Sequence, residues 1–148
     1  MSTLKINLTD PVHVSTYRIL YGDTDAGGVV YNANYLRFFE LARSNFMRHY
    51  VASYREIEEA GFILPVVESY VRYKAPARYD DLLTIKTSMQ QVSPYSWRFN
   101  HHVLLSESDK LLAKGFTVHA CVNRAGKLTR PPAVYLDRIA EVASTPQP

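Results

Sequence analysis

Residues 35 to 50 place hydrophobic side chains at the spacing of an amphipathic α-helix. When successive residues are set about 100° apart, apolar side chains cover one broad arc and polar ones form a narrow stripe opposite it. An arc of this width predicts a helix that other elements enclose on several sides. The arc contains Tyr35, Leu36, Phe38, Phe39, Ala42, Phe46, Met47 and Tyr50, and the stripe contains Arg37, Glu40, Ser44 and Arg48.

Much of the remaining chain alternates apolar and polar residues, a period of two that is typical of β-strands with one weakly packed face. Polar turns separate the later strands, which are therefore expected to pair in antiparallel hairpins within an α+β fold. Strands are predicted near residues 13 to 21, 66 to 74, 82 to 92, 95 to 105 and 111 to 123. One face of the last strand is expected to carry Leu112, Phe116, Val118 and Val122.

Two shorter helices are also predicted. Ser53 and Glu56 form an S-x-x-E capping box, which predicts a helix that begins at Ser53 and ends at Gly61. Residues 133 to 142 are expected to form a loose terminal helix. Because the chain shows neither a repeat nor a linker, residues 1–148 are expected to form a single domain with its core at about 13–132.

Composition narrows the class of protein. The chain has 148 residues, of which 47% are hydrophobic, and its net charge of +3 favours anionic ligands. Its basic residues are scattered, which argues against a dedicated nucleic-acid-binding arm. No stretch approaches the ~18 apolar residues that span a bilayer, and no secretion signal is evident, so we expect a cytoplasmic protein without a membrane span.

Several kinds of catalytic site are not expected. The single cysteine, Cys121, has no partner for an internal disulfide or a cysteine-based metal site. The adjacent His101 and His102 should point to opposite faces of a strand, and no H-E-x-x-H pattern occurs, so no metal site is predicted. The G-x-S-x-G pattern of α/β serine hydrolases is also absent. Neither a metal nor another cofactor is therefore expected.

The loop before the long helix carries the most informative chemistry. It contains Asp23 and Asp25, followed by the glycine pair Gly27 and Gly28. Glycine lets backbone approach a ligand closely, and a helix N-terminus offers unpaired N–H groups that can bind a developing oxyanion. A carboxylate beside such donors makes a minimal site for acyl transfer. The alternative is that both aspartates only organise a turn, while an asparagine, Asn32 or Asn34, caps the helix.

The sequence D-T-D-x-G-G-V-V-Y-x-x-x-Y at residues 23–35, followed by Glu40, resembles the hotdog-fold acyl-CoA thioesterases of the 4-hydroxybenzoyl-CoA thioesterase type and their Tol–Pal-associated relatives. The resemblance covers roughly residues 14–132 and includes the segments 64–67, 73–77 and 80–85. It implies a five-stranded antiparallel sheet wrapped around a long central helix. It also implies a homodimer with active sites at its interface, often within a homotetramer.

The same resemblance suggests roles for individual residues. Asp25 matches the catalytic carboxylate of the family, and Asp23 matches the first acid of the motif, for which we expect a structural role. The backbone amide of Asn32 matches the group that faces the thioester carbonyl, and Tyr31 and Leu64 are the other implied substrate-binding residues. Asn32 is a departure, because many Tol–Pal-associated members have histidine there. A preference for short aliphatic acyl groups is therefore less expected.

The sequence thus predicts a thioesterase that converts an aromatic or short-to-medium-chain acyl-CoA into the free acid and CoA. An acyl-carrier-protein substrate stays open, because the basic run that grips CoA in the 4-hydroxybenzoyl type falls on the non-basic residues 93–95. Two other functions also stay open: a hotdog protein that binds acyl thioesters without hydrolysing them, and a basic RNA-binding module. Candidate cations for the CoA phosphates are Arg78, Arg98, Arg124, Lys127 and Arg130.

Overall fold

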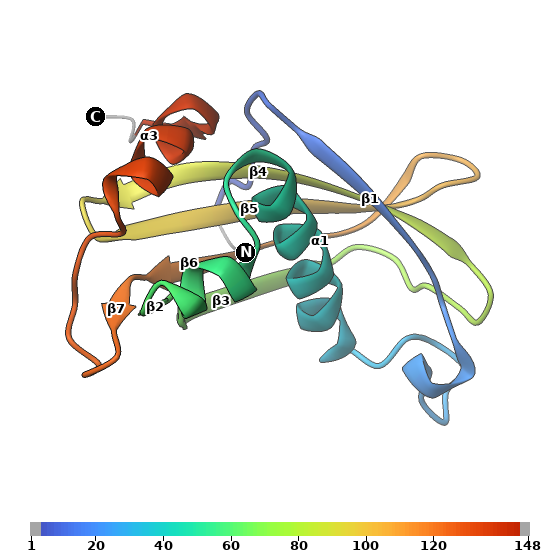
Figure 1. The fold of residues 1–148 in the computed structure, drawn as a ribbon. Helices are drawn as coiled ribbons and strands as arrows, with labels where there is room; N and C mark the ends of the chain where they lie inside the picture. Colours follow the sequence, from blue (N-terminus) through green and yellow to red (C-terminus); the bar gives the residue numbers. More distant parts are fainter. Residues whose placement is uncertain (1–3, 146–148) are drawn as a thin grey trace.

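The computed structural model describes residues 4–145, which form an antiparallel sheet with helices on one of its faces (Figure 1). The main strands run in the order β1-β4-β5-β6-β3, so β1 and β3 lie at the two edges. The short strand β8 (Ala143–Ser144) adds to β4 in parallel, and β2 (Phe62–Ile63) pairs separately with β7 (Val122–Asn123). The main strands are β1 (His13–Arg18), β3 (Val66–Tyr73), β4 (Leu82–Ser93), β5 (Ser96–Leu105) and β6 (Lys110–Ala120).

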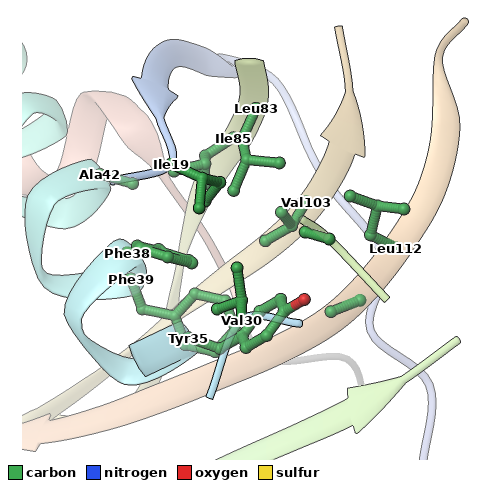
Figure 2. Packing of buried hydrophobic residues seen from close by; sticks show 12 residues of the cluster. Ile19, Val30, Tyr35, Phe38, Phe39, Ala42, Leu83, Ile85, Val103 and Leu112 are labelled. Atoms are coloured by element: carbon green, nitrogen blue, oxygen red, sulfur yellow. The ribbon is translucent and has the colours of Figure 1, made fainter. Parts of the chain in front are cut away.

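The predicted long helix is confirmed as α1 (Asn34–Tyr50), which lies against one face of the sheet (Figure 1). Its apolar arc is largely buried as the spacing predicts, although Leu36 stays 39% exposed and Tyr50 is half-buried. Figure 2 shows the ring side chains of α1 facing aliphatic side chains of the strands. Near the N-terminal half of α1 this core joins Tyr35, Phe38 and Phe39 to Val30, Leu83, Ile85, Val103 and Leu112.

Both shorter helices are present. In α2 (Tyr54–Glu59) the Ser53 side chain accepts a hydrogen bond from the Glu56 N–H, and Gly61 follows the helix with φ +97°, a conformation that favours glycine. The terminal helix α3 (Ala133–Val142) is packed more firmly than expected. Its buried side chains complete a second core around the C-terminal half of α1, together with Phe46, Met47, Met89, Trp97 and Phe99.

The opposite face of the sheet is partly covered by the N-terminal segment, residues 4–10. His102 Nε2 donates to the Ile6 carbonyl at 2.7 Å, and the Ile6 side chain packs on Phe116 and Val118. His101 points the other way, where its ring stacks on Phe39 at a centroid distance of 4.5 Å. The expectation that the two adjacent histidines face opposite sides is therefore confirmed.

One predicted face was wrong. Leu112 packs in the core beneath α1, whereas Phe116 and Val118 pack on the other face of the sheet. The register between β5 and β6 shifts between Val103 and Leu104, and such a bulge reverses the side to which the following residues point. The first strand also ends earlier than predicted, at Arg18. Within residues 4–145, no helix is long and apolar enough to cross a membrane.

Candidate active site

The motif loop after β1 folds into a short helical turn and then a narrow hairpin. The one-turn 3₁₀ helix η1 (Tyr21–Asp23) comes first. The Asp25 N–H then donates to the Val29 carbonyl at 2.9 Å, and the Gly28 N–H donates back to the Asp25 carbonyl at 3.0 Å. Gly28 has φ +80°, a backbone conformation that is unfavourable for a residue with a side chain. Gly28 therefore serves this tight turn, which begins at Asp25.

Asp23 is buried and its carboxylate is fully engaged. One oxygen accepts hydrogen bonds from the Tyr17 hydroxyl at 2.7 Å and the Leu20 N–H at 2.8 Å. The other oxygen lies 3.2 Å from the guanidinium of Arg37 on α1. Burial and the hydrogen bond to Asp23 raise the pKa of Tyr17, so its hydroxyl stays protonated as a donor. These contacts tie β1, η1 and α1 together.

Asp25 lies two residues further along and is exposed. Its Oδ1 accepts a hydrogen bond from the Gly27 N–H at 2.8 Å, and its other oxygen makes no hydrogen bond within residues 4–145. The same turn lies beside Arg78, because Val29 forms an isolated antiparallel bridge with that residue. Asp25 is therefore the acid of the motif that can reach a ligand.

The N-terminus of α1 presents free main-chain donors. The first turn is closed by hydrogen bonds from the N–H groups of Asn34 and Tyr35 to the carbonyls of Tyr31 and Asn32, at 2.9 and 3.3 Å. In the part of the chain that the structure describes, the N–H groups of Asn32 and Ala33 donate no hydrogen bond. Free N–H groups at this end of a helix carry partial positive charge. They can therefore bind a developing oxyanion.

Neither asparagine caps the helix, so the capping alternative is wrong. The N-cap residue is Ala33, which has no side-chain cap. Asn34 instead donates its side-chain amide to the carbonyl of Asp23 at 2.8 Å, and Tyr31 donates its N–H to the same oxygen at 2.9 Å. Asp23 thereby connects the start of α1 to the motif hairpin through its main chain as well as its side chain.

A largely apolar cavity of about 320 Å³ opens between this loop and the end of β3. Two aromatic rings stand against each other in its wall, Tyr35 from α1 and Tyr73 from β3, at a centroid distance of 5.2 Å and nearly perpendicular. Burial raises the pKa of both phenols, which therefore stay neutral. The cavity is lined by Val29, Val30, Asn32, Tyr35, Tyr73, Lys74, Ala75 and Pro76.

The structure brings some of the predicted site residues together and separates others. Asn32 lines the cavity, and Asp25 begins the turn of the adjoining hairpin, paired with the cavity-lining Val29. Tyr31 is 51% exposed outside the cavity lining. Leu64 packs in the second core, and its carbonyl accepts a hydrogen bond from His119 Nδ1 at 2.9 Å, so it does not line this cavity either.

The sequence interpretation missed two groups near the cavity. Tyr73 and Lys74 belong to the segment 73–77, which carries part of the family resemblance but no predicted role at the site. Of the five candidate cations for CoA, Arg78 lies beside the Asp25 turn. Arg98 lies on the opposite face of the sheet over Phe116, and the other candidates lie in or after the β7 turn. Lys74, which lines the cavity, and Arg78, beside the Asp25 turn, are therefore cations adjacent to this site.

A metal site is not found in the described part of the chain, residues 4–145, where no cluster of three or more histidine, cysteine or acidic side chains could hold an ion. The protein groups that the structure places at the site include the Asp25 carboxylate, main-chain N–H groups and tyrosine hydroxyls.

Comparison with known proteins agrees with this geometry. A putative esterase of Aquifex aeolicus (strain VF5) is 31% identical over 120 residues, 81% of this chain and 91% of the relative. The acyl-CoA thioester hydrolase YbgC of Escherichia coli O157:H7 is 37% identical over 106 residues, 72% of this chain and 78% of YbgC. The crystal structure of Slr0204, a 1,4-dihydroxy-2-naphthoyl-CoA thioesterase from Synechocystis, superposes with a TM-score of 0.82 at 25% identity, covering 88% of this chain and 96% of that one.

The family profile described as the thioesterase-like superfamily matches residues 19–142, which include the motif loop, α1 and the whole of the β3 to β6 sheet. With the relatives above, this match shows that the chain belongs to the thioesterase-like superfamily and has its hotdog fold.

Proposed function

We propose that this protein hydrolyses acyl-CoA thioesters to the free acid and CoA, as a single hotdog domain without a cofactor. The observation that carries the proposal is the N–H of Asn32, which donates no hydrogen bond within residues 4–145 and lies at the positive end of α1. Asn32 also lines the apolar cavity, next to the hairpin of Asp25. A thioester carbonyl that enters this cavity would find a hydrogen-bond donor where negative charge develops.

The reaction follows from these groups. The Asp25 carboxylate either attacks the thioester carbon or removes a proton from the water that does so, and the carbonyl oxygen becomes an oxyanion held by the Asn32 N–H. Collapse of this intermediate breaks the C–S bond and releases the CoA thiolate, which takes up a proton. Direct attack leaves an anhydride on Asp25 that water then hydrolyses. In both versions one water is consumed for each acid and CoA formed.

The acyl group that we propose is aromatic or of short-to-medium length. The cavity volume of about 320 Å³ suits such a group, and Tyr35 and Tyr73 provide aromatic walls. The similar Slr0204 acts on an aromatic acyl-CoA, which supports the same class here. Lys74 and Arg78 are proposed to attract the CoA phosphates, and an acyl-carrier protein is the second candidate carrier.

We further propose a homodimer with active sites at its interface, assembled into a homotetramer and located in the cytoplasm. Edge strand β3 supports the interface, because Val66 and Val67 are 47% and 60% exposed and an unpaired edge favours pairing with another chain. A second protomer there would lie next to Tyr73, at the mouth of the cavity. In a reducing cytoplasm the single buried thiol of Cys121 would stay free.

The decisive experiment combines a thiol-release screen with Asp25→Asn. The screen covers acyl-CoA and acyl-carrier-protein substrates, and the best one is then used for kcat and binding. Asn keeps a polar group in the turn but removes the charge, so kcat should fall ~100-fold or more while affinity for the substrate largely persists. A folded Asp25→Asn protein with near-normal kcat would overturn this mechanism. Saturable acyl-CoA binding without thiol release by the unaltered protein would instead indicate a non-catalytic binding protein.

The oligomeric state is tested separately by sedimentation. Val67→Lys places a charge on the exposed β3 edge and should weaken the dimer and lower turnover together. A monomeric unaltered protein with full activity would contradict the interfacial site.

A further inference from the structure

We propose that Tyr73 is a positioning residue, whose hydroxyl fixes the peptide that orients the oxyanion donor at Asn32. This inference rests on the function proposed above. Its central observation is the hydrogen bond from the Tyr73 hydroxyl to the Asn32 carbonyl oxygen, at 2.8 Å between residues 41 positions apart in the chain.

Two peptide units meet at the Asn32 Cα, and each has its own anchor. The unit that carries the Asn32 N–H is held at its other end, where the Tyr31 carbonyl accepts a 2.9 Å hydrogen bond from Asn34. The next unit carries the Asn32 carbonyl and the Ala33 N–H, which point in opposite directions in a trans peptide. Within the described residues this unit has two bonds: a 3.3 Å contact from the Tyr35 N–H and the shorter one from Tyr73. Tyr73 is therefore its main anchor.

Tyr73 itself is held rigidly enough to act as an anchor. It is the last residue of β3 and pairs with Ala113 of β6. The next two N–H groups, those of Lys74 and Ala75, both donate to the Leu112 carbonyl, at 2.8 and 3.1 Å. The Tyr73 ring is also braced edge-on by Tyr35. The hydroxyl thus ties the 32–33 peptide to the sheet, whereas the other hydrogen bond of this peptide is the 3.3 Å contact from the Tyr35 N–H.

The consequence for catalysis is geometric. A main-chain donor stabilises an oxyanion strongly only when it is already aimed at the position that the oxygen will occupy. Loss of the Tyr73 hydroxyl would leave the 32–33 peptide held only by the 3.3 Å contact from the Tyr35 N–H. The Asn32 Cα, which this peptide shares with the unit that carries the Asn32 N–H, could then shift, and displacements of about 1 Å in such a site can cost on the order of 100-fold in rate. The ring would still form its part of the cavity wall, so substrate binding should change little.

Tyr73→Phe tests the kinetic part. We expect kcat to fall ~10-fold or more, with KM and the melting temperature nearly unchanged, because the phenyl ring keeps the contact with Tyr35. Tyr70→Phe is the matched control. Tyr70 lies on the same strand but stacks on Phe116 on the other face, and its hydroxyl makes no hydrogen bond within residues 4–145. It should behave like the unaltered protein, and a normal kcat in Tyr73→Phe would overturn the inference.

A spectroscopic measurement separates orientation from general damage. Benzoyl-CoA with a ¹³C-labelled thioester carbonyl is bound to Asp25→Asn, which should consume it ~100-fold or more slowly than the unaltered protein. Its carbonyl stretch is compared with that in Asp25→Asn/Tyr73→Phe. We expect a smaller shift from the solution frequency in the double variant, because the donor is less well aimed. An equal shift would overturn the inference even if kcat falls. If Asp25→Asn consumes the substrate at a near-normal rate, the mechanism of the proposed function fails, while the kcat of Tyr73→Phe still decides the role of Tyr73.

Discussion

The ring of Phe39 lies directly over the Cα of Gly115, so that α1 approaches β6 as closely as a residue without a side chain allows. A Cβ built on Gly115 would overlap both the Phe39 ring and the Tyr70 carbonyl oxygen. The same ring stacks on the buried His101, the cross-strand neighbour of Gly115, at an interplanar angle of 8°. Phe39 is fully buried between these neighbours, which fixes the height of α1 above the sheet.

Gly115→Ala should therefore destabilise the protein. Overpacking a filled core costs ~1–3 kcal/mol, and here part of the clash is with backbone that cannot rotate away. Urea unfolding measures the change, and Gly22→Ala serves as the control because its added Cβ meets no atom within 4 Å. Equal stability of the two variants would show that α1 can shift without cost.

Asp23→Asn should reduce stability more than Asp25→Asn does. The side-chain oxygen of the introduced asparagine can still accept some of the hydrogen bonds that Asp23 accepts. Its NH₂ group cannot accept one, and it would face the Tyr17, Leu20 or Arg37 donors. A buried donor or acceptor left unpaired costs roughly 1–3 kcal/mol. Thermal melting of both variants provides the comparison. A larger loss in Asp25→Asn would reverse the structural and catalytic roles given to the two aspartates.

Asn32→Ala should leave substantial turnover and change substrate preference only modestly. The proposed donor is the main-chain N–H, and the Asn32 side chain makes no hydrogen bond in the described part of the chain. We expect kcat to fall less than ~10-fold, against ~100-fold or more for Asp25→Asn. Steady-state kinetics over the same acyl-CoA set tests this. A loss as large as that of Asp25→Asn would make the Asn32 side chain catalytic.

Stability should decrease as the pH falls from about 6.5 toward 4, because His119 is neutral and buried. Its Nδ1–H donates to the Leu64 carbonyl, and Nε2 accepts from Thr117 at 2.9 Å. Burial lowers the pKa of His119 to about 4, whereas an unfolded histidine has a pKa of about 6.5. In that window the unfolded chain binds a proton that the folded chain does not. The free energy of unfolding therefore falls by up to ~3 kcal/mol.

Urea unfolding at several pH values measures this loss. The non-titrating variant His119→Gln should show a smaller decrease over the same range. The decrease that remains should include His101, whose pKa burial also lowers. If stability depends on pH identically in the variant and the unaltered protein, His119 is not a cause of the loss of stability.

Local patterns in the sequence determined the elements and the chemistry of the loop. The apolar period predicted α1 to within about one residue at each end, and alternation located the strands, because both patterns depend only on which side chains must be buried. The resemblance carried by the Asp23–Tyr35 motif indicated the family. The bulge near Leu112 was not predictable from alternation, since an inserted residue changes the facing without changing the composition.

The tertiary structure decided how those residues are used. Asp23 and Asp25 are two positions apart in one motif, and only the packing of Tyr17 and Arg37 around Asp23 leaves Asp25 as the acid free to react. The Tyr73 hydroxyl meets Asn32 only because the sheet brings the end of β3 to the start of α1. Sequence periodicity records which side chains are buried, whereas a hydrogen bond between distant segments depends on where the completed fold places both partners.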